Sequence, residues 1–313
     1  MPKLFGKGGA FKMQSAAKPS KNTRRLLFAV IVVAAFCLML KLFPAIFSPS
    51  VPPVEHGYAK VCFLDTGQSD CSLILTENAT VLIDCGEIGC ERTVCTLLKK
   101  YGVKTIDIFV ATHPHSDHIG TASAVFSEFE VKRLLLPEIP REYISDTQLY
   151  DELLSSAKAE KGCVVSFAKP GDVFSLEDNS RLMVLGPVDC YFDNINNWSV
   201  VTKFVFGETS FLFTGDMEAS AEADLIASGA DISCNVLKIG HHGSRTSSTD
   251  DFLSASNPDF GVILCGSGNV HGHPHDSVKQ ALKAHKIKVF RTDLDGTVTM
   301  STNGSGISVE TEK

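Results

Sequence analysis

Residues 112–120 of the chain, THPHSDHIG, place three histidines and one aspartate within six positions. Imidazole nitrogens and carboxylate oxygens are the ligands that divalent first-row metals accept. We expect His113 and His115 to point the same way, with Asp117 and His118 serving a second position, so that the loop reaches two ions about 3.5–4 Å apart. The chain has only 10 histidines, and this clustering favours metal binding over a histidine-rich surface loop.

A second polar turn follows the apolar run in FLFTGDME, residues 211–218, and carries Asp216. A carboxylate in such a turn can bridge two metals through its two oxygens. A turn aspartate that caps the next helix is the ordinary alternative. Beside the histidine-rich loop the bridging role is favoured, and we assign Asp117 and Asp216 as both metal ligands and catalytic carboxylates.

Two adjacent histidines, His241 and His242, follow the apolar run in VLKIGHHGSRTSS, residues 236–248. Neighbours on an extended chain point opposite ways, so we expect one to bind metal and the other to orient it or touch the substrate. The sequence leaves open which one binds. Ser244 and Arg245 are candidate contacts for an anionic substrate, although Arg245 also suits a solvated loop.

A fourth motif, GSGNVHGHPHDSV at residues 266–278, alternates His271, His273 and His275. It too follows an apolar run. Histidine here can bind metal or donate a proton to a leaving group. We assign His273 as the catalytic and substrate-binding member, and we expect the other two to have local roles.

Supporting roles fall to polar residues on other strands. Asp84 ends a strand in VLIDCGE and is placed to orient a metal-binding histidine, and Asp65 is given the same supporting role. For Asp65 and Asp70, turn formation is the alternative. The segment NNWSVV offers Asn197 and Ser199 as substrate contacts.

The elements that position these motifs are strands followed by turns. Apolar, β-branched runs precede the motifs at 106–111, 209–214, 234–239 and 260–265. A loop at the carboxyl end of a strand is where α/β folds place ligands. Helical patterns interleave with the strands at 91–101, 119–128, 146–160, 218–228, 249–255 and 275–285. This alternation predicts a layered α/β fold.

The N-terminal region has a different composition. Residues 1–25 carry seven basic residues and no acidic one, and residues 26–40, LLFAVIVVAAFCLML, are uncharged. With a snorkelling Lys41 the apolar run reaches about 18 residues, near the lower limit for a membrane helix. We predict a basic cytoplasmic tail (1–25), a single-pass anchor in the cell membrane (26–47), a Pro-rich linker (48–57) and an extracellular catalytic domain (58–313). A cleaved signal peptide is the alternative.

The predicted outer part is acidic. Residues 42–313 contain 21 basic and 36 acidic residues, a net charge of −15. Such a charge excludes broad electrostatic binding of nucleic acid. An anionic substrate must therefore be held locally, by metal or by a few donors. Nine cysteines lie outside the apolar run, and their pairing is left open.

Together these motifs resemble the metallo-β-lactamase superfamily, and more closely the hydrolase domain of ComEC-type DNA-uptake proteins. The likeness covers most of residues 58–308 and rests on FLDTGQSD, LIDCGE, THPHSDHIG, NNWSVV, SFLFTGD, LKIGHHGSRTSS, GHPH and GTVTM. It implies a four-layer αββα sandwich with two divalent ions, zinc or manganese, at one edge of its two sheets. It assigns the metal ligands as His113, His115, Asp117, His118, Asp216, and His241 or His242.

One departure from the family pattern stands at Asn197, where the superfamily often has a further histidine ligand. The resemblance therefore implies that the ion at His113 and His115 is under-coordinated and is where substrate binds.

The activity that follows is metal-assisted hydrolysis, in which two ions lower the pKa of a water. A phosphodiester such as single-stranded DNA is the expected substrate, and no obligate protein partner is inferred. One alternative is hydrolysis of a cell-wall phosphoester, lactone or β-lactam on the same fold. Another is an anchored binding protein without catalysis.

Overall fold

The computed structural model describes residues 51–177 and 179–313, together with residues 21, 28 and 30–32. The chain divides into two units, Met1–Pro49 and Ser50–Lys313. The predicted tail and anchor fall almost wholly outside the described residues and stay predictions. Among the residues that are described, no helix combines the length and the apolar character needed to cross a bilayer.

The second unit contains one eight-stranded sheet with the order β17-β16-β1-β2-β3-β5-β7-β8. Its strands are β1 (Ala59–Phe63), β2 (Ser72–Leu75), β3 (Thr80–Ile83), β5 (Ile108–Val110), β7 (Arg133–Leu136), β8 (Val164–Phe167), β16 (Val298–Thr302) and β17 (Ile307–Thr311). The neighbours β3, β5, β7 and β8 run parallel, whereas the strands from β17 to β3 alternate in direction.

A seven-stranded sheet faces it, with the order β15-β14-β13-β12-β11-β10-β9. Its strands are β9 (Val173–Glu177), β10 (Ser180–Gly186), β11 (Val201–Phe206), β12 (Thr209–Phe213), β13 (Val236–Lys238), β14 (Phe260–Ile263) and β15 (Lys288–Arg291). The short strands β4 (Thr105–Ile106) and β6 (Glu130–Val131) pair separately. From β12 to β15 the neighbours are parallel.

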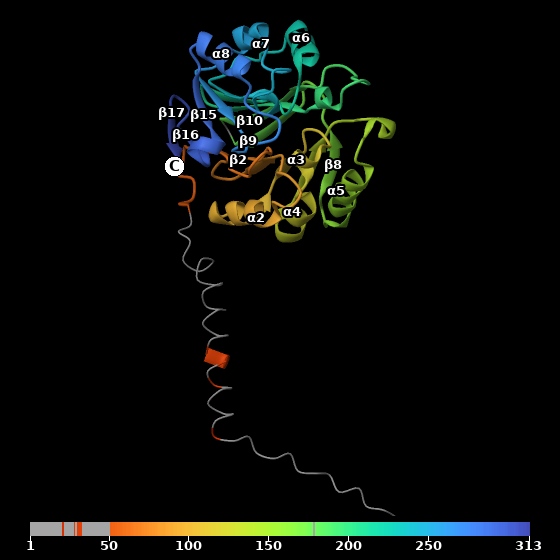
Figure 1. Cartoon of the computed structure of the whole chain (residues 1–313), viewed down its shortest axis with the longest axis vertical. Coiled ribbons are helices and arrows are strands. Elements are labelled where there is room, and N and C mark those ends of the chain that lie inside the picture. The colour runs from red at the N-terminus through yellow and green to blue at the C-terminus, as the bar shows by residue number, and fades with distance from the viewer. Residues whose placement is uncertain (1–20, 22–27, 29, 33–50, 178) are drawn as a thin grey trace, which may run out of the picture. The chain divides into compact units, whose positions relative to one another are not determined.

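Helices cover both outer faces of this double layer. In Figure 1, α2, α4 and α5 lie on one side of the sheets, and α6, α7 and α8 lie on the other. The helices are α2 (Glu91–Lys100), α3 (Ser116–Ile119), α4 (Ala122–Glu128), α5 (Thr147–Ala159), α6 (Ala219–Ala227), α7 (Asp250–Ser256), α8 (Asp276–Ala284) and α9 (Thr292–Asp295), with 3₁₀ turns η1 (Arg141–Tyr143), η2 (Ile195–Trp198) and η3 (Gly240–Gly243). The expected αββα sandwich is confirmed.

Burial on both faces explains why the strands read as continuous apolar runs. In β1, Val61 and Phe63 belong to the core between the two sheets, whereas Cys62 belongs to the core beneath the helices. Phe63 stacks on Phe213 of the opposite sheet with ring centroids 5.9 Å apart. Burying each such ring stabilises the sandwich by about 1.5–3 kcal/mol.

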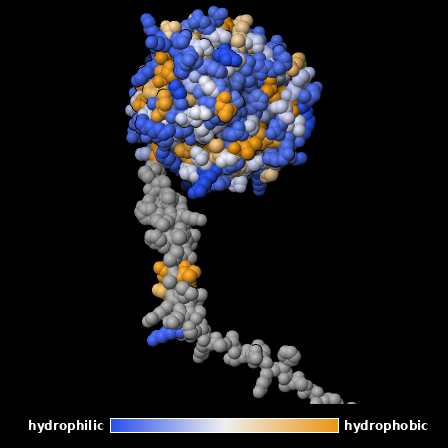
Figure 2. All heavy atoms as spheres, viewed as in Figure 1, coloured by the Kyte–Doolittle hydropathy of each residue, from blue (hydrophilic) through white to orange (hydrophobic). Residues whose placement is uncertain are grey.

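The surface is polar by comparison. Hydrophilic residues predominate on the face of residues 51–313 shown in Figure 2. The nine cysteines that the structure describes are all free thiols, six of them buried.

Strand direction brings the sequence motifs to one edge of the sandwich. The parallel strands β3, β5 and β7 end at the same edge of one sheet, and β12, β13 and β14 end together in the other. The two edges are joined where the Val200 amide donates to the Thr112 carbonyl at 2.9 Å. Loops from both sheets therefore surround one common space.

Candidate metal centre

Asp216 lies at the centre of this space. Its Oδ2 is 3.3 Å from His118 Nε2, 3.6 Å from His241 Nε2 and 3.7 Å from His242 Nε2. The carboxylate follows β12, and its backbone amide donates to Ser199 Oγ at 3.0 Å. Three imidazoles from α3 and η3 thus converge on one buried carboxylate.

The turn before Asp216 requires glycine. Gly215 has a φ of +52°, and a Cβ there would lie 2.8 Å from Ser199 Oγ and 3.0 Å from Thr112 Cβ. A side chain at 215 would therefore push apart the loops that hold the carboxylate in place.

Four residues form what we call the deep half of the centre: Asp117, His118, Asp216 and His242. Their candidate ligand atoms all lie within 4.8 Å of one another. His118 Nδ1 donates to Asp84 Oδ2 at 2.7 Å, which leaves Nε2 facing the cluster. Within the described residues, His118 Nε2 and Asp216 Oδ1 are buried without a hydrogen-bond partner. Buried orphaned atoms of these types fit a divalent cation.

His242 is oriented in the same manner by the backbone. Its Nδ1 donates to the Leu264 carbonyl at 3.0 Å, and its Nε2 lies 3.1 Å from Asp117 Oδ2. The side chain is 2 % exposed. Hydrogen bonding therefore fixes Nε2 as the atom offered to a metal.

His113 and His115, together with Asp216, form the outer half. His113 Nε2 and His115 Nδ1 are 2.9 Å apart. Thr112 Oγ1 donates to Asp84 Oδ2 at 2.8 Å and lies 3.2 Å from His113 Nδ1, so it accepts the Nδ1 proton. The lone pair of His113 Nε2 then faces His115 Nδ1, an arrangement that suits a shared cation.

The electrostatics of the two halves are opposite. Burial alone would lower the pKa of His118, but the carboxylates of Asp216, Asp84 and Asp117 raise it well above its usual value. Burial also lowers the pKa of His242, but the carboxylates of Asp216 and Asp70 outweigh burial and raise this pKa to about 10. In the outer half, burial and repulsion by His118 hold the pKa of His113 well below normal and lower that of His115.

The expectation that His241 and His242 point opposite ways is wrong. Both residues are left-handed, with φ of 50° and 53°, so the alternation of an extended chain does not apply. Both rings face Asp216 as a result. This conformation costs of order 1–3 kcal/mol per residue and persists only where its surroundings impose it.

Lys238 has a part in the centre that the sequence did not predict, and Asp70, a candidate for turn formation, is its partner. Lys238 is 2 % exposed, forms an ion pair with Asp70, and donates to the Gly215 carbonyl at 3.1 Å. Asp70 Oδ1 in turn lies 3.2 Å from His242 Nδ1. A lysine inside the apolar run VLKIG was the available signal, because a buried ammonium needs a buried carboxylate partner.

Asp84 contacts His118 and Thr112 as described, but Asp65 does not take part in the same way. The Asp65 carboxylate lies 3.2 Å from Lys313 Nζ, with the aspartate 29 % exposed. It follows β1 at a turn, whereas Asp70 directs its carboxylate inward. The supporting role expected of Asp65 is thus occupied by Asp70.

The expected substrate contacts mostly turn inward. Asn197 Oδ1 accepts from the Glu218 amide at 2.9 Å, and Ser199 is fully buried against Asp216. Ser244 is 4 % exposed, with its hydroxyl 3.0 Å from Thr246 Oγ1. Arg245 alone of these candidates is exposed to solvent. The first three support the loops of the site from within.

His273 is partly exposed and lies beside the centre. Its ring centroid is 5.6 Å from that of His241 and 6.2 Å from that of His242. Asn269 fixes the loop by accepting from the His273 amide at 3.0 Å and donating to its carbonyl at 2.6 Å. Burial, then repulsion by His242 and His241, lowers the pKa of His273 to about 4. The ring is therefore neutral at pH 7.

An exposed aromatic pair lies on loops at the same edge. Tyr143, in the turn η1 after β7, and Phe192, in the loop after β10, have ring centroids 5.0 Å apart and are 39 % and 56 % exposed. Trp198 lies behind them, 6.2 Å from Phe192, with its Nε1 donating to the Tyr191 carbonyl at 2.6 Å. Trp198 is buried and packs against Phe192.

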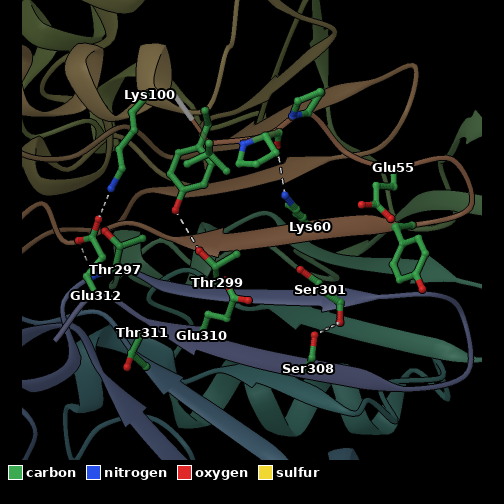
Figure 3. A pocket seen from close by; sticks show the side chains of 15 residues that line it. Glu55, Lys60, Lys100, Thr297, Thr299, Ser301, Ser308, Glu310, Thr311 and Glu312 are labelled. Atoms are coloured by element: carbon green, nitrogen blue, oxygen red, sulfur yellow. Dashed lines mark hydrogen bonds and ion pairs between the residues drawn. The ribbon is translucent and has the colours of Figure 1, made fainter. Parts of the chain in front are cut away.

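A separate polar groove lies over β16 and β17 (Figure 3), and its lining contains none of the centre's residues. Its polar groups satisfy one another: Lys100 pairs with Glu312, Tyr101 shares a hydrogen bond of 2.9 Å with Thr299, and Lys60 donates to a backbone carbonyl. The orphaned atoms at Asp216 and His118 distinguish the histidine site from this groove.

A double sheet covered by helices, with histidines and aspartates gathered where both sheets end, defines a metallo-hydrolase fold. The family model of the metallo-beta-lactamase superfamily matches residues 64–267, more than half of the chain. The chain belongs to this superfamily.

Among characterised proteins it is similar to ComEC-type competence proteins. It is 31 % identical over 296 residues to ComE operon protein 3 of Bacillus subtilis, a match that covers 88 % of this chain and 36 % of that protein. It is 29 % identical over 264 residues to competence protein ComA of Neisseria gonorrhoeae, covering 82 % of this chain and 34 % of the relative. The chain thus spans about a third of the length of these relatives.

Solved structures share the fold. The metallo-β-lactamase fold protein YhfI of Bacillus subtilis superposes with a TM-score of 0.52 at 12 % identity, covering 78 % of this chain and 99 % of YhfI. CmlA, a diiron β-hydroxylase of Streptomyces venezuelae, gives 0.53 at 15 % identity, covering 80 % and 54 %.

Proposed function

We propose that this chain is a metal-dependent phosphodiesterase that acts on DNA outside the cell and is tethered to the cell membrane by residues 26–47. The observation that carries the proposal is the convergence of three imidazoles on the Asp216 carboxylate, beside orphaned His118 Nε2. A binding module without catalysis has no need of so many open ligand atoms around one carboxylate.

The metal ligands in the proposal are His113, His115, Asp117, His118, Asp216 and His242. Bound divalent ions would supply a water of lowered pKa and would neutralise charge on the phosphate. The Asp117 carboxylate, 26 % exposed, is the proposed acceptor of the proton that the attacking water releases. As a neutral imidazole, His273 donates a hydrogen bond to the departing oxygen more readily than a full proton.

Two features support DNA as the substrate. The similarity to competence proteins extends over more than four fifths of the chain, and the family match at residues 64–267 spans the segment that carries the metal ligands. The exposed rings of Tyr143 and Phe192 offer a stacking surface for an unpaired base, and such stacking contributes about 1–3 kcal/mol per base. Because residues 42–313 are acidic, we expect the metals and these rings, rather than a basic channel, to hold the strand.

The test is cleavage by the purified full chain, supplied with Mn²⁺ or Zn²⁺. Single-stranded DNA, duplex DNA, bis-p-nitrophenyl phosphate and nitrocefin are the substrates, with Asp117→Ala/His118→Ala as the inactive variant and His285→Ala as the matched surface control. We expect both phosphodiesters to be cleaved by the wild type and the control only. Cleavage of nitrocefin alone would instead favour a β-lactam or lactone hydrolase.

The anchor is supported by the basic tail and the apolar run of the sequence. A protease added outside intact cells should remove the catalytic domain and leave the tail protected. Release of the whole chain into the medium would favour a cleaved signal peptide.

A further inference from the structure

His241 has a carboxylate partner of its own. Its Nδ1 lies 3.2 Å from Glu218 Oε1 and 3.2 Å from Thr246 Oγ1. When Nδ1–H donates to the carboxylate, the lone pair of Nε2 is left facing Asp216 Oδ2, 3.6 Å away. The same arrangement holds His118, whose Nδ1 donates to Asp84. Histidines that bind metal characteristically donate their other ring proton to a carboxylate in this way.

Glu218 is held by the segment that lacks the family's histidine. Asn194 Nδ2 and Asn196 Nδ2 donate to the two oxygens of Glu218 at 2.8 and 2.9 Å. Asn197 Oδ1 accepts from the Glu218 amide at 2.9 Å. The asparagines of residues 194–197 thus hold the carboxylate that orients His241, in place of supplying a ligand themselves.

His241 lies on the open side of the centre. Its side chain is 22 % exposed, against 2 % for His242. His241 lies outside the group of four side chains whose ligand atoms are all within 4.8 Å of one another, yet its Nε2 is 3.6 Å from Asp216 Oδ2, the carboxylate that the two halves share. The paired left-handed conformations at 241 and 242 bring both rings to Asp216, with their Nε2 atoms 3.6 and 3.7 Å from its Oδ2.

We propose that His241 is the third histidine ligand of the outer half, with Nε2 binding the ion held by His113 and His115, and that Glu218 is its positioning residue. This inference rests on the two-metal centre of the proposed function. The sequence predicts that the ion at His113 and His115 has too few ligands from the protein. In this proposal, His241 of η3 supplies the further ligand. Each of the two adjacent histidines then serves a different ion.

The test is a metal titration of the metal-free full chain, followed by calorimetry and by metal analysis after gel filtration, with Zn²⁺ and Mn²⁺ in turn. We expect two classes of site in the wild type. His241→Ala should lose the weaker class, or weaken it at least 10-fold, and keep the tighter one unchanged. His285→Ala is the matched control and should keep both classes, because His285 is 21 % exposed, much like His241, and pairs with Asp250 at 2.7 Å outside the centre.

Glu218→Gln is the second variant, because it keeps the size of the side chain and removes its charge. Outer-shell partners of this kind change metal affinity by about 10–100-fold, so we expect a weakening in that range for the weaker class alone. This variant decides the question if His241→Ala fails to fold.

The inference is overturned if both variants bind two ions with wild-type affinities, since His241 would then be a substrate contact. It is also overturned if either variant loses the tighter class first, or if the wild type binds a single ion. Metal binding is read without any substrate. If the variants lose only the weaker ion but the wild type cleaves no phosphodiester, His241 is a metal ligand and the proposed function is wrong.

Discussion

The deep and outer halves of the centre share Asp216 but differ in burial and charge. In the deep half, the side chains of His118 and His242 are 0 % and 2 % exposed, and Asp84, Asp70 and Asp216 surround them. In the outer half, His113 is also buried but His115 is partly exposed, and the two rings face each other.

The difference in charge explains how the proposed centre would both retain metal and admit substrate. Carboxylates in the deep half raise the pKa values of His118 and His242, so in the metal-free protein a proton stands where a cation would bind. In the outer half, burial keeps His113 neutral and its lone pair available. In the proposed centre, the deep half would hold its ion more tightly, and the outer half, where His115 is partly exposed, would exchange its ion and meet the substrate.

The largest effect should come from removing what the halves share. Asp216→Asn keeps the shape of the side chain and removes the charge that faces three imidazoles. We expect binding of both ions to weaken and phosphodiester cleavage to fall by about 10³-fold or more, because the reaction depends on both. Metal analysis and initial rates measure this. Loss of one ion only would show that Asp216 does not serve both halves.

Removing a ligand of the outer half alone should show whether the two ions bind independently. His115→Ala removes the imidazole 2.9 Å from His113 Nε2 without touching the deep half. We expect one ion to remain bound with wild-type affinity and cleavage to fall by about 10²-fold, since positioning of the substrate is lost. A variant that loses both ions would contradict the independence of the halves.

A smaller change should follow in the deep half from Asp84→Asn. The amide keeps an oxygen for Thr112 but weakens the bond to His118 Nδ1. We expect the tighter ion to bind about 10–100-fold more weakly, with the outer ion unaffected. Calorimetric titration distinguishes this result from a uniform loss of both sites.

The pH dependence of the metal-free chain should show the same asymmetry. The pKa of His242 is raised to about 10, above its unfolded value of 6.5, so the folded state holds more protons across this interval. The stabilisation that this proton provides is complete below pH 6.5 and is lost as pH rises toward 10. Denaturant midpoints in chelator should therefore fall between pH 7 and 9.5, while the apparent affinity of the tighter ion rises. In His242→Gln, the denaturant midpoint should fall less between pH 7 and 9.5.

The smallest effect belongs to a carboxylate outside the centre. Asp65→Asn removes a partly exposed ion pair with Lys313, worth less than about 1 kcal/mol. Both metal affinities should stay at wild-type values. A loss of metal in this variant would return Asp65 to the supporting role that the structure gives to Asp70.

Much of the fold was predictable from the sequence, because the motifs of the site follow apolar strands. The helix at 146–160 is α5 and that at 275–285 is α8, each within a few residues of its bounds. Edge strands such as β9 and β17 give a weaker sequence signal, because a strand with one neighbour and alternating exposure lacks the continuous apolar run of an interior strand.

Within the site, the ligand-bearing loops were predictable and their supports were not. Asp70 and Asp65 both sit in polar turns after β1, and only the fold shows which carboxylate meets Lys238. The orientation of His241 depends on a left-handed backbone that residue type does not announce. Asn197 and Ser199 resembled surface contacts because polar side chains that face inward look the same in sequence as those that face solvent.

Two unequal ions acting together at Asp216 are central to the proposed reaction. The direct test is to titrate Mn²⁺ into the metal-free full chain while following bound metal per chain and cleavage of bis-p-nitrophenyl phosphate in the same samples. We predict that the first equivalent binds with little cleavage and that cleavage rises with the second. Full cleavage at one equivalent, or none at two, would contradict it.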